Sequence, residues 1–246
     1  MNYNEAYELL KAKDQLHILR YYDELDNEGK ESLLKQISAI DFSILDNLHA
    51  KEDKKESTIV PINAMTLEDI EKKHDGYKSA GLKAIKAGDL ALVLLAGGQG
   101  TRLGFDGPKG TLNVGETKDM FIFQLLVEHT LDVVHESGTW IHFFIMTNVK
   151  NHEQTTTFFR EHDYFGYNRD YIHFFRQEMV PSTDFDGKIL LEDKGQICLS
   201  PNGNGGWFSS LERAGLMDTI VKDNIKWINV FSVDNVLQGI ADPVFL

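Results

Sequence analysis

The sequence predicts an α/β fold built on a mostly parallel sheet. Apolar runs of strand length alternate along the chain with segments of helical periodicity, which is the pattern of successive strand–helix units. One of these runs, Leu90 to Leu95, is apolar on both of its alternating faces, as expected for a strand that helices cover on both sides. This run leads directly into a turn rich in glycine.

The N-terminal part of the chain has a different pattern. Residues 3–50 carry leucine and isoleucine at the spacing of two or three amphipathic helices, which we interpret as a helical layer. Residues 51–57, KEDKKES, form a charged break, which we interpret as a solvated connector. We therefore expect a helical N-terminal segment over residues 1–57 and a nucleotide-binding α/β domain over residues 58–246.

Helices and strands are expected to alternate after the connector. Thr66 followed by Asp69 is the signature of a capped helix start, and Gly88 ends that helix. The two dipeptides Asp186-Gly187 and Lys194-Gly195 predict a β-hairpin insert over 184–199. The predicted helices cover residues 66–87, 120–134, 153–162, 207–216 and 217–223, and the predicted strands cover residues 90–95, 141–146, 171–175 and 226–233.

The composition excludes several classes of function. The net charge of -13 argues against a general nucleic-acid partner, which would require a basic surface. The single cysteine, Cys198, excludes an intrachain disulfide framework and a cysteine zinc cluster. No uninterrupted apolar run is long enough to span a bilayer, and the first residues form no apolar leader segment. We expect a cytoplasmic protein with no membrane partner.

The glycine-rich turn after Leu95 predicts a phosphate site. Glycines allow close approach of the backbone to a ligand, and the N–H groups of such turns converge on anions. Arg102 and Lys109 in the same loop add two cations, so a nucleoside di- or triphosphate fits better than an ordinary turn with solvated basic residues. The spacing matches neither a Walker loop nor a dinucleotide loop, which argues against a dinucleotide-dependent oxidoreductase.

Other candidate residues follow the carboxyl ends of predicted strands, where ligands bind in open α/β sheets. Asp234 is either a helix cap or a Mg²⁺ ligand beside the phosphates. Gln177 is either a turn residue or a reader of the edge of a uracil. Asn204, in a second glycine-rich turn, is either a turn residue or a ligand contact. The histidines show no spacing of a catalytic or metal-binding motif.

The motif L-x-G-G-x-G-T-R-[LM]-G followed by P-K, here LLAGGQGTRLGFDGPKG, resembles that of the UDP-sugar pyrophosphorylases. The blocks FRQEMVPSTDFDGKILLEDKGQICLSPNGNGGWFSSL and FSVDNVL…ADPVF are similar to the matching blocks of the branch that acts on N-acetylhexosamines. The resemblance covers roughly residues 60–246. It implies a Rossmann-like sheet of the nucleotide-diphospho-sugar transferase type.

The resemblance also implies roles for individual residues. Lys109 and Arg102 would contact the phosphates and act in catalysis, and Asp234 would bind Mg²⁺ and the nucleotide. Gln177 would read the uracil with Gly203 close by, and Asn204 would face the sugar. The backbone would hold the uridine at Leu95, Ala96, Gly97 and Gly98.

The implied reaction joins UTP and N-acetylglucosamine 1-phosphate to UDP-N-acetylglucosamine and pyrophosphate, by in-line attack at the α-phosphate. Glucose 1-phosphate is the alternative sugar substrate, and a non-catalytic nucleotide-binding module is the alternative of a different class. Members of the family continue well past the block at Asp234, so this chain resembles an N-terminal fragment. We expect weak UTP binding, poor turnover, and self-association through the surface that the missing half would cover.

Overall fold

The computed structural model describes residues 1–43, 45 and 58–246. The chain divides into two compact units. The first comprises Met1–Pro61 and Met179–Asn202, and the second comprises Ile62–Glu178 and Gly203–Leu246. The predicted connector 51–57 lies outside the described residues.

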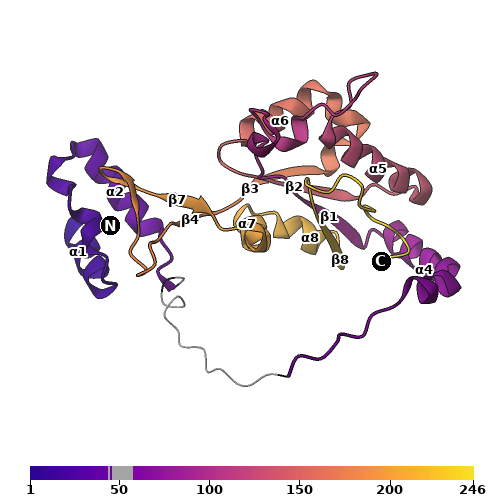
Figure 1. Ribbon diagram of the computed structural model, residues 1–246, viewed down its shortest axis with the longest axis horizontal. Coiled ribbons are helices and arrows are strands. Elements are labelled where there is room, and N and C mark those ends of the chain that lie inside the picture. Colours follow the sequence, from indigo (N-terminus) through magenta and orange to yellow (C-terminus); the bar gives the residue numbers. More distant parts are fainter. Residues whose placement is uncertain (44, 46–57) are drawn as a thin grey trace. The chain divides into compact units, whose positions relative to one another are not determined.

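The second unit is built on a four-stranded sheet in the order β3-β2-β1-β8 (Figure 1). Its strands are β1 (Leu90–Leu95), β2 (His142–Thr147), β3 (Ile172–Arg176) and β8 (Trp227–Ser232). All three pairings are parallel, so the four carboxyl ends share one edge of the sheet. Leu95, the last residue of β1, is in register with Met146 and Ser232. The predicted α/β fold with a parallel sheet is therefore confirmed.

Helices cover both faces of this sheet, as the continuous apolar strands require (Figure 1). Leu90, Leu92 and Leu94 pack in a core with residues of α4 (Leu67–Lys86), α5 (Ile122–Ser137) and α6 (His152–Glu161). Ala91 and Val93 face the other side, where α7 (Trp207–Arg213) and α8 (Met217–Lys222) pack.

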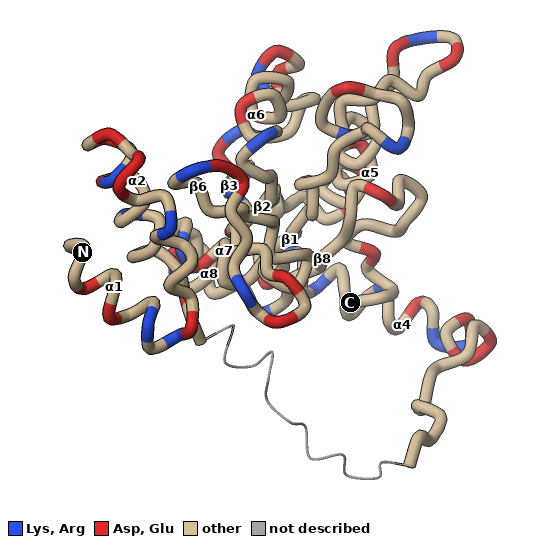
Figure 2. The backbone as a smooth tube through the Cα atoms, turned by 60° about the vertical axis from the view of Figure 1, so that its left-hand side comes forward, with Lys and Arg blue, Asp and Glu red and all other residues tan. Residues whose placement is uncertain are grey.

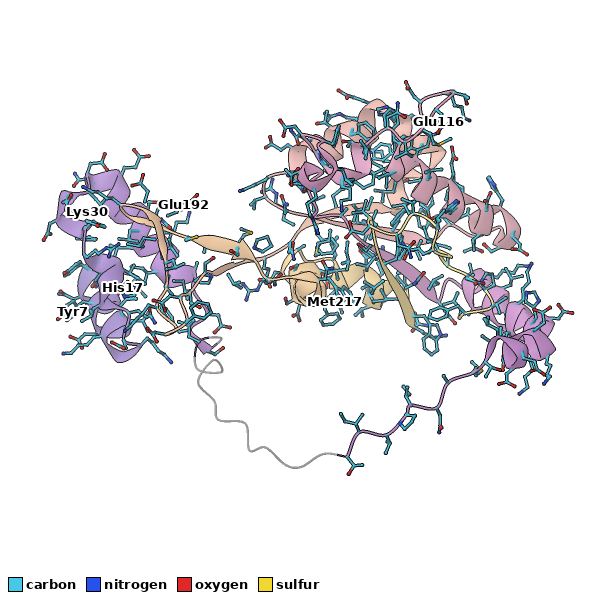
Figure 3. All side chains as sticks on the ribbon, in the orientation of Figure 1. Tyr7, His17, Lys30, Glu116, Glu192 and Met217 are labelled. Carbon is cyan, nitrogen blue, oxygen red and sulfur yellow. The ribbon has the colours of Figure 1, made fainter. Side chains whose placement is uncertain are left out.

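The side chains of Thr66 and Asp69 form the predicted capping box at the start of α4. Met217 marks the start of α8, and Glu116 lies on the loop before α5 (Figure 3).

The first unit combines N-terminal helices with the insert. These helices include α1 (Tyr3–Ala12), α2 (Asn27–Ala39) and the short 3₁₀ turns Leu16–Leu19 and Tyr22–Glu24. Figure 2 shows acidic and basic residues interspersed along α1 and α2, as expected for solvated helix faces. The insert contains β5 (Leu191–Asp193) paired with β6 (Gln196–Ile197), and β4 (Met179–Pro181) paired with β7 (Leu199–Pro201).

Side chains of the N-terminal helices bind the backbone of the insert. The Gln15 amide donates to the Gly187 carbonyl at 2.8 Å and accepts from the Ile189 N–H at 2.9 Å. Ile189 and Ile197 of the insert are buried with apolar residues of α1 and α2 in one core. Tyr7, His17 and Lys30 of the N-terminal region and Glu192 of the insert belong to this unit (Figure 3).

The predicted hairpin insert is present, but its extent and its packing differ from the expectation. The antiparallel β4–β7 ribbon extends the insert on both sides of residues 184–199. The compact units group residues 179–202 with the N-terminal helices, whereas the predicted division at residue 57 places the insert in the α/β domain. Among the described residues, no helix is long and apolar enough to cross a membrane.

Candidate functional site

The glycine loop leaves the centre of the sheet and folds back on itself. The Ala96 N–H donates to the Met146 carbonyl at 2.8 Å, which carries the parallel ladder one residue beyond β1. The loop then closes through two backbone bonds, from Gly100 N–H to the Gly107 carbonyl at 2.9 Å and from Lys109 N–H to the Gly98 carbonyl at 3.2 Å. These bonds fix the Lys109 backbone beside the start of the loop.

Glycine is required in this loop at two points of close packing. A Cβ at Gly110 would lie 2.2 Å from the ring of Phe123, a fully buried residue of α5. A Cβ at Gly100 would lie 2.6 Å from the ring of Phe105. At Gly98, by contrast, nothing lies within 4 Å of the Cβ position, and the residue is exposed. The exposed backbone at Gly98 is open to a ligand.

Lys109 and Asp234 meet at the sheet edge. The Lys109 ammonium donates to Asp234 Oδ1, forming an ion pair between the loop after β1 and the residues after β8. The Lys109 side chain is 14% exposed and that of Asp234 is 58% exposed. The hydrogen bond from Lys109 lowers the pKa of Asp234, with smaller contributions from Ser232 and the charge of Arg102. Both predicted cations therefore act on the carboxylate of Asp234.

Arg102 lies on a short 3₁₀ turn, Thr101–Leu103, and its side chain is exposed. Gly104 ends that turn with a φ of 69°, a left-handed conformation that favours glycine. Arg102 has a long side chain with several donors, which suits contact with phosphate oxygens.

Gln177 connects the glycine loop to the second glycine-rich turn. Its N–H donates to the Thr147 carbonyl at 2.7 Å, directly beyond the end of β3. Its side-chain amide is 6% exposed overall, and Nε2 donates to the Gly203 carbonyl at 2.7 Å. The Cβ position of Gly97 lies 3.0 Å from Gln177 Oε1. The side chain is thus fixed with Oε1 beside the glycine loop.

The second glycine-rich turn presents its backbone to solvent. Gly203 has a φ of 80°, and Asn204 begins a 3₁₀ turn that leads into α7. Both residues are exposed. Gly203 accepts the hydrogen bond from the Gln177 amide, whereas the Asn204 side chain makes no hydrogen bond that would fix it within the described part of the chain.

Glu178 fixes the start of α7, a role that was not predicted, although the residue lies in the segment after the strand at 171–175. Its N–H donates to Ser210 Oγ at 3.0 Å, and its carboxylate accepts from Ser209 Oγ at 2.7 Å and pairs with Arg213 at 2.6 Å. These contacts hold the turn at Gly203 against the end of β3. Only the position of Glu178 directly after Gln177 signals its role in the sequence.

Two asparagines beyond β2 were also missed. The amide of Asn148 donates to the Gly97 carbonyl at 2.5 Å, and the amide of Asn151 donates to the Ala96 carbonyl at 3.1 Å. Both side chains are buried. Their position at the end of a predicted strand is the one signal that could have identified them.

The donor set at Asp234 fits a magnesium ion carried by a nucleotide. Asp234 offers one carboxylate at the phosphate side of the loop, and Mg²⁺ is typically bound by one or two carboxylates together with phosphate oxygens and water. Among the described residues, no group of three or more histidine, cysteine, aspartate or glutamate side chains is placed to hold a metal ion. Asp234 is the described residue that would hold such an ion, and the phosphate oxygens of the nucleotide would supply further ligands.

Comparison with known proteins gives consistent results. A family profile described as UTP–glucose-1-phosphate uridylyltransferase matches residues 39–246. The chain is 35% identical over 262 residues to UDP-N-acetylglucosamine diphosphorylase 2 of Arabidopsis thaliana, a match that covers 97% of this chain and 51% of that protein. It is 35% identical over 247 residues to UDP-N-acetylglucosamine pyrophosphorylase of Saccharomyces cerevisiae, with 98% and 51% covered.

Solved structures show the same likeness. The uridine diphosphate N-acetylglucosamine pyrophosphorylase of Trypanosoma brucei, solved with an inhibitor, superimposes with a TM-score of 0.80 at 29% identity, covering 98% of this chain and 53% of that one. A putative UDP-N-acetylglucosamine pyrophosphorylase of Entamoeba histolytica gives a TM-score of 0.67 at 36% identity, covering 76% and 48%. The chain thus spans about half the length of the relatives it matches.

Proposed function

Because this chain belongs to the UTP–glucose-1-phosphate uridylyltransferase family, we propose that its sheet edge is the nucleotide half of a uridylyltransferase site. The reaction joins UTP and N-acetylglucosamine 1-phosphate to UDP-N-acetylglucosamine and pyrophosphate. The observation that carries the proposal is the meeting of Lys109 and Asp234 beside the glycine loop. At that point the cation can bind phosphate oxygens, and the carboxylate can bind the metal ion that accompanies them.

The proposed chemistry needs no nucleophile from the protein. A phosphate oxygen of the sugar 1-phosphate forms a bond to the α-phosphorus of UTP, and the bond from that phosphorus to the bridging oxygen of the departing pyrophosphate breaks. Lys109 and Arg102 stabilise the negative charge that develops on the phosphate oxygens, and the fixed loop holds the nucleotide in line with the attacking group. Mg²⁺ held by Asp234 would add further neutralisation of phosphate charge.

Gln177 is proposed to recognise the base. Because its Nε2 already donates to the Gly203 carbonyl, its Oε1 remains as an acceptor beside Gly97. Uracil carries an N–H at position 3, whereas cytosine carries an unprotonated nitrogen there. An acceptor fixed at this point therefore favours UTP over CTP. The backbone of residues 95–98 is proposed to hold the uridine beside it.

The N-acetylated sugar is favoured over glucose by the names of the relatives at 35% identity. The solved UDP-glucose pyrophosphorylases match at a lower level, such as the Leishmania major protein at 16% identity and a TM-score of 0.58, which supports a common fold alone. Asn204 is proposed to face the sugar from its exposed turn. A nucleotide-binding module without turnover is the second candidate, because the fixed groups at the sheet edge are assigned to the nucleotide and Asn204 alone is assigned to the sugar.

The proposal includes a cytoplasmic location, which the single cysteine favours because disulfides are characteristic of oxidising compartments. It includes no nucleic-acid partner, in agreement with the net charge of -13. Self-association of the chain stays a prediction.

Pyrophosphate release tests the proposed reaction. The chain is incubated with UTP and Mg²⁺ and with either N-acetylglucosamine 1-phosphate or glucose 1-phosphate. We expect release that depends on the sugar phosphate and is faster with the N-acetylated sugar. Equal rates with both sugars would contradict the assigned preference, and UTP binding without release from either would favour the nucleotide-binding module.

A further inference from the structure

Asn148 and Asn151 form a reciprocal pair in the turn between β2 and α6. The Asn148 N–H donates to Asn151 Oδ1 at 2.8 Å, and the Asn151 N–H donates to Asn148 Oδ1 at 2.9 Å. Asn148 Oδ1 also accepts from the Lys150 N–H at 2.7 Å. Asn151 is fully buried and Asn148 is 7% exposed. Both side chains are therefore fixed by their oxygens, and each has an amide nitrogen left to donate.

These two amide nitrogens bind three consecutive carbonyls of the glycine loop. Asn148 Nδ2 donates to the Gly97 carbonyl at 2.5 Å. Asn151 Nδ2 donates to the Ala96 carbonyl at 3.1 Å and, more weakly, to the Gly98 carbonyl at 3.4 Å. The turn after β2 thus holds the first three residues of the loop after β1.

The orientation of the loop N–H groups follows from these contacts. In a trans peptide the C=O and N–H groups point in opposite directions. With the carbonyls of residues 96–98 directed at the two asparagines, the N–H groups of Gly97, Gly98 and Gln99 are directed away from them. Within the part of the chain that the structure describes, these three N–H groups donate to no protein acceptor. Successive free N–H groups of this kind are donors for a polar or anionic ligand.

We propose that Asn148 and Asn151 are positioning residues, which hold the glycine loop so that the free N–H groups of Gly97, Gly98 and Gln99 face the nucleotide. This inference rests on the proposed function, because it takes UTP as the ligand. Asparagine suits both positions because one short side chain supplies an acceptor for the turn and a donor for the loop carbonyl. Aspartate supplies the acceptor and, when ionised, has no donor.

The contrast between asparagine and aspartate separates positioning from a merely structural role. Asn148→Asp keeps the oxygen that accepts from Lys150 and Asn151 and loses the donor to the Gly97 carbonyl. Asn151→Ala removes all contacts of the second side chain. The control is Asn168→Asp, because the Asn168 side chain accepts from the Asp170 N–H at 3.1 Å and donates no hydrogen bond in the described structure. It adds the same charge at a distant turn.

The experiment titrates each full-length variant with UTP in Mg²⁺ and with uridine, well below its melting temperature. Uridine carries no phosphate, so repulsion between phosphate and the new carboxylate does not affect it. We expect Asn148→Asp to lose about tenfold or more in affinity for both ligands. A tenfold loss corresponds to about 1.4 kcal/mol, roughly the net free energy of one hydrogen bond. Its melting temperature is expected to fall, because the buried carboxylate loses the hydrogen bond to the Gly97 carbonyl, so both titrations are made on folded protein. Asn168→Asp should match the wild type in both affinities.

Three results distinguish the proposals. Wild-type affinities for both ligands in Asn148→Asp would overturn the positioning role and leave the proposed function intact. Loss of UTP binding with unchanged uridine binding would overturn it as well, because charge repulsion alone would then explain the loss. Absence of UTP binding by the wild type would overturn the proposed function itself. If Asn151→Ala does not fold, Asn148→Asp carries the test, since it retains the bonds of the turn.

Discussion

Lys109 and Asp234 are 125 positions apart in the sequence and form an ion pair at the carboxyl edge of the sheet. The pair exists because β1 and β8 are parallel neighbours, with Leu95 in register with Ser232. The loop after β1 and the residues after β8 therefore emerge side by side. One group of the pair is suited to phosphate and the other to a metal ion.

Asp234→Asn should uncouple UTP binding from Mg²⁺. In the wild type we expect Mg²⁺ to increase UTP affinity, because the proposed ion would be bound by the carboxylate of Asp234 together with phosphate oxygens. In the variant the increase should fall by about tenfold, which corresponds to the loss of one charged ligand contact. The measurement is calorimetric titration with UTP, with Mg²⁺ present or replaced by a chelator. An undiminished effect of Mg²⁺ in the variant would place the ion elsewhere.

The Lys109–Asp234 pair should be insensitive to pH near neutrality. The pKa of Asp234 is lowered chiefly by the hydrogen bond from Lys109, so its carboxylate remains charged throughout the neutral range. Any stability that it contributes is present above the usual aspartate pKa and is lost as the pH falls through the lowered value. UTP affinity should therefore change little between about pH 6 and 8 through this group. A Lys109-dependent decline of affinity within that range would contradict the assignment.

Stability in weak acid should depend on His173 instead. Burial, followed by the charge of His142, lowers the pKa of His173 from 6.5 to about 4. His173 is hydrogen-bonded to His142 at 2.9 Å, and His142 is bonded to Asp223 at 2.8 Å, at the opposite end of the strands from the glycine loop. The unfolded chain binds a proton at His173 below about pH 6.5, whereas the folded chain remains neutral there until about pH 4.

The free energy of unfolding should therefore fall as the pH is lowered from about 6.5 to 4. Because His173 is only partly buried, its contribution should be well below the limit of about 1.4 kcal/mol per pH unit. Below about pH 4 the destabilisation caused by His173 no longer increases, and above about pH 6.5 it is absent. Urea denaturation at several pH values measures it. His173→Phe preserves an aromatic ring against Phe144 and should give a shallower pH dependence. An unchanged slope would show that His173 is not the group responsible.

Two glycines of the loop should differ in the effect of substitution by alanine. Gly110→Ala should destabilise the fold by roughly 1–3 kcal/mol, because the new methyl group meets the buried ring of Phe123. Gly98→Ala should change stability by less than about 1 kcal/mol, because nothing in the protein lies near its Cβ position. It should nevertheless weaken UTP binding, since the methyl group enters the space assigned to the ligand. Thermal melting and UTP titration of both variants separate the two effects, and unchanged affinity in Gly98→Ala would exclude close ligand contact there.

Gln177→Ala should reduce the preference for UTP over CTP by about tenfold, because the proposed acceptor for the uracil N–H is removed. Gln124→Ala is the matched control, since among the described residues the Gln124 side chain bonds only to Glu128 on the surface of α5. The measurement is the ratio of the two nucleotide affinities in each variant. A ratio that is the same in Gln177→Ala and in the wild type would remove Gln177 from base recognition.

Local sequence patterns predicted the strands of the parallel sheet and the candidate residues that follow their carboxyl ends. Leu90 to Leu95 is apolar on both faces, so it was identified as a buried parallel strand, and the residues after each strand were then assigned to one edge. The β4–β7 ribbon was not predicted, because each strand has three residues and their pairing joins segments about 20 positions apart. The packing of the insert on the N-terminal helices depends on Gln15 and Ile189, whose contact spans 174 positions.

Asn148 and Asn151 were missed for a related physical reason. Asparagine after a strand is typical of a turn or a helix cap, and the oxygens of both residues do serve the turn. Their amide nitrogens act on a loop about 50 positions earlier, which becomes adjacent only when β1 and β2 pair. No local pattern carries that information.

The most direct test of the proposed nucleotide site is calorimetric titration of the chain with UTP in Mg²⁺, compared between the wild type, Lys109→Ala and Lys222→Ala. Lys222 is an exposed lysine at the end of α8, so its variant controls for the change in net charge. We predict that the wild type and Lys222→Ala bind UTP equally and that Lys109→Ala binds at least about tenfold more weakly. UTP binding that is absent in the wild type, or equal in all three proteins, would contradict the assignment of this sheet edge as a UTP site.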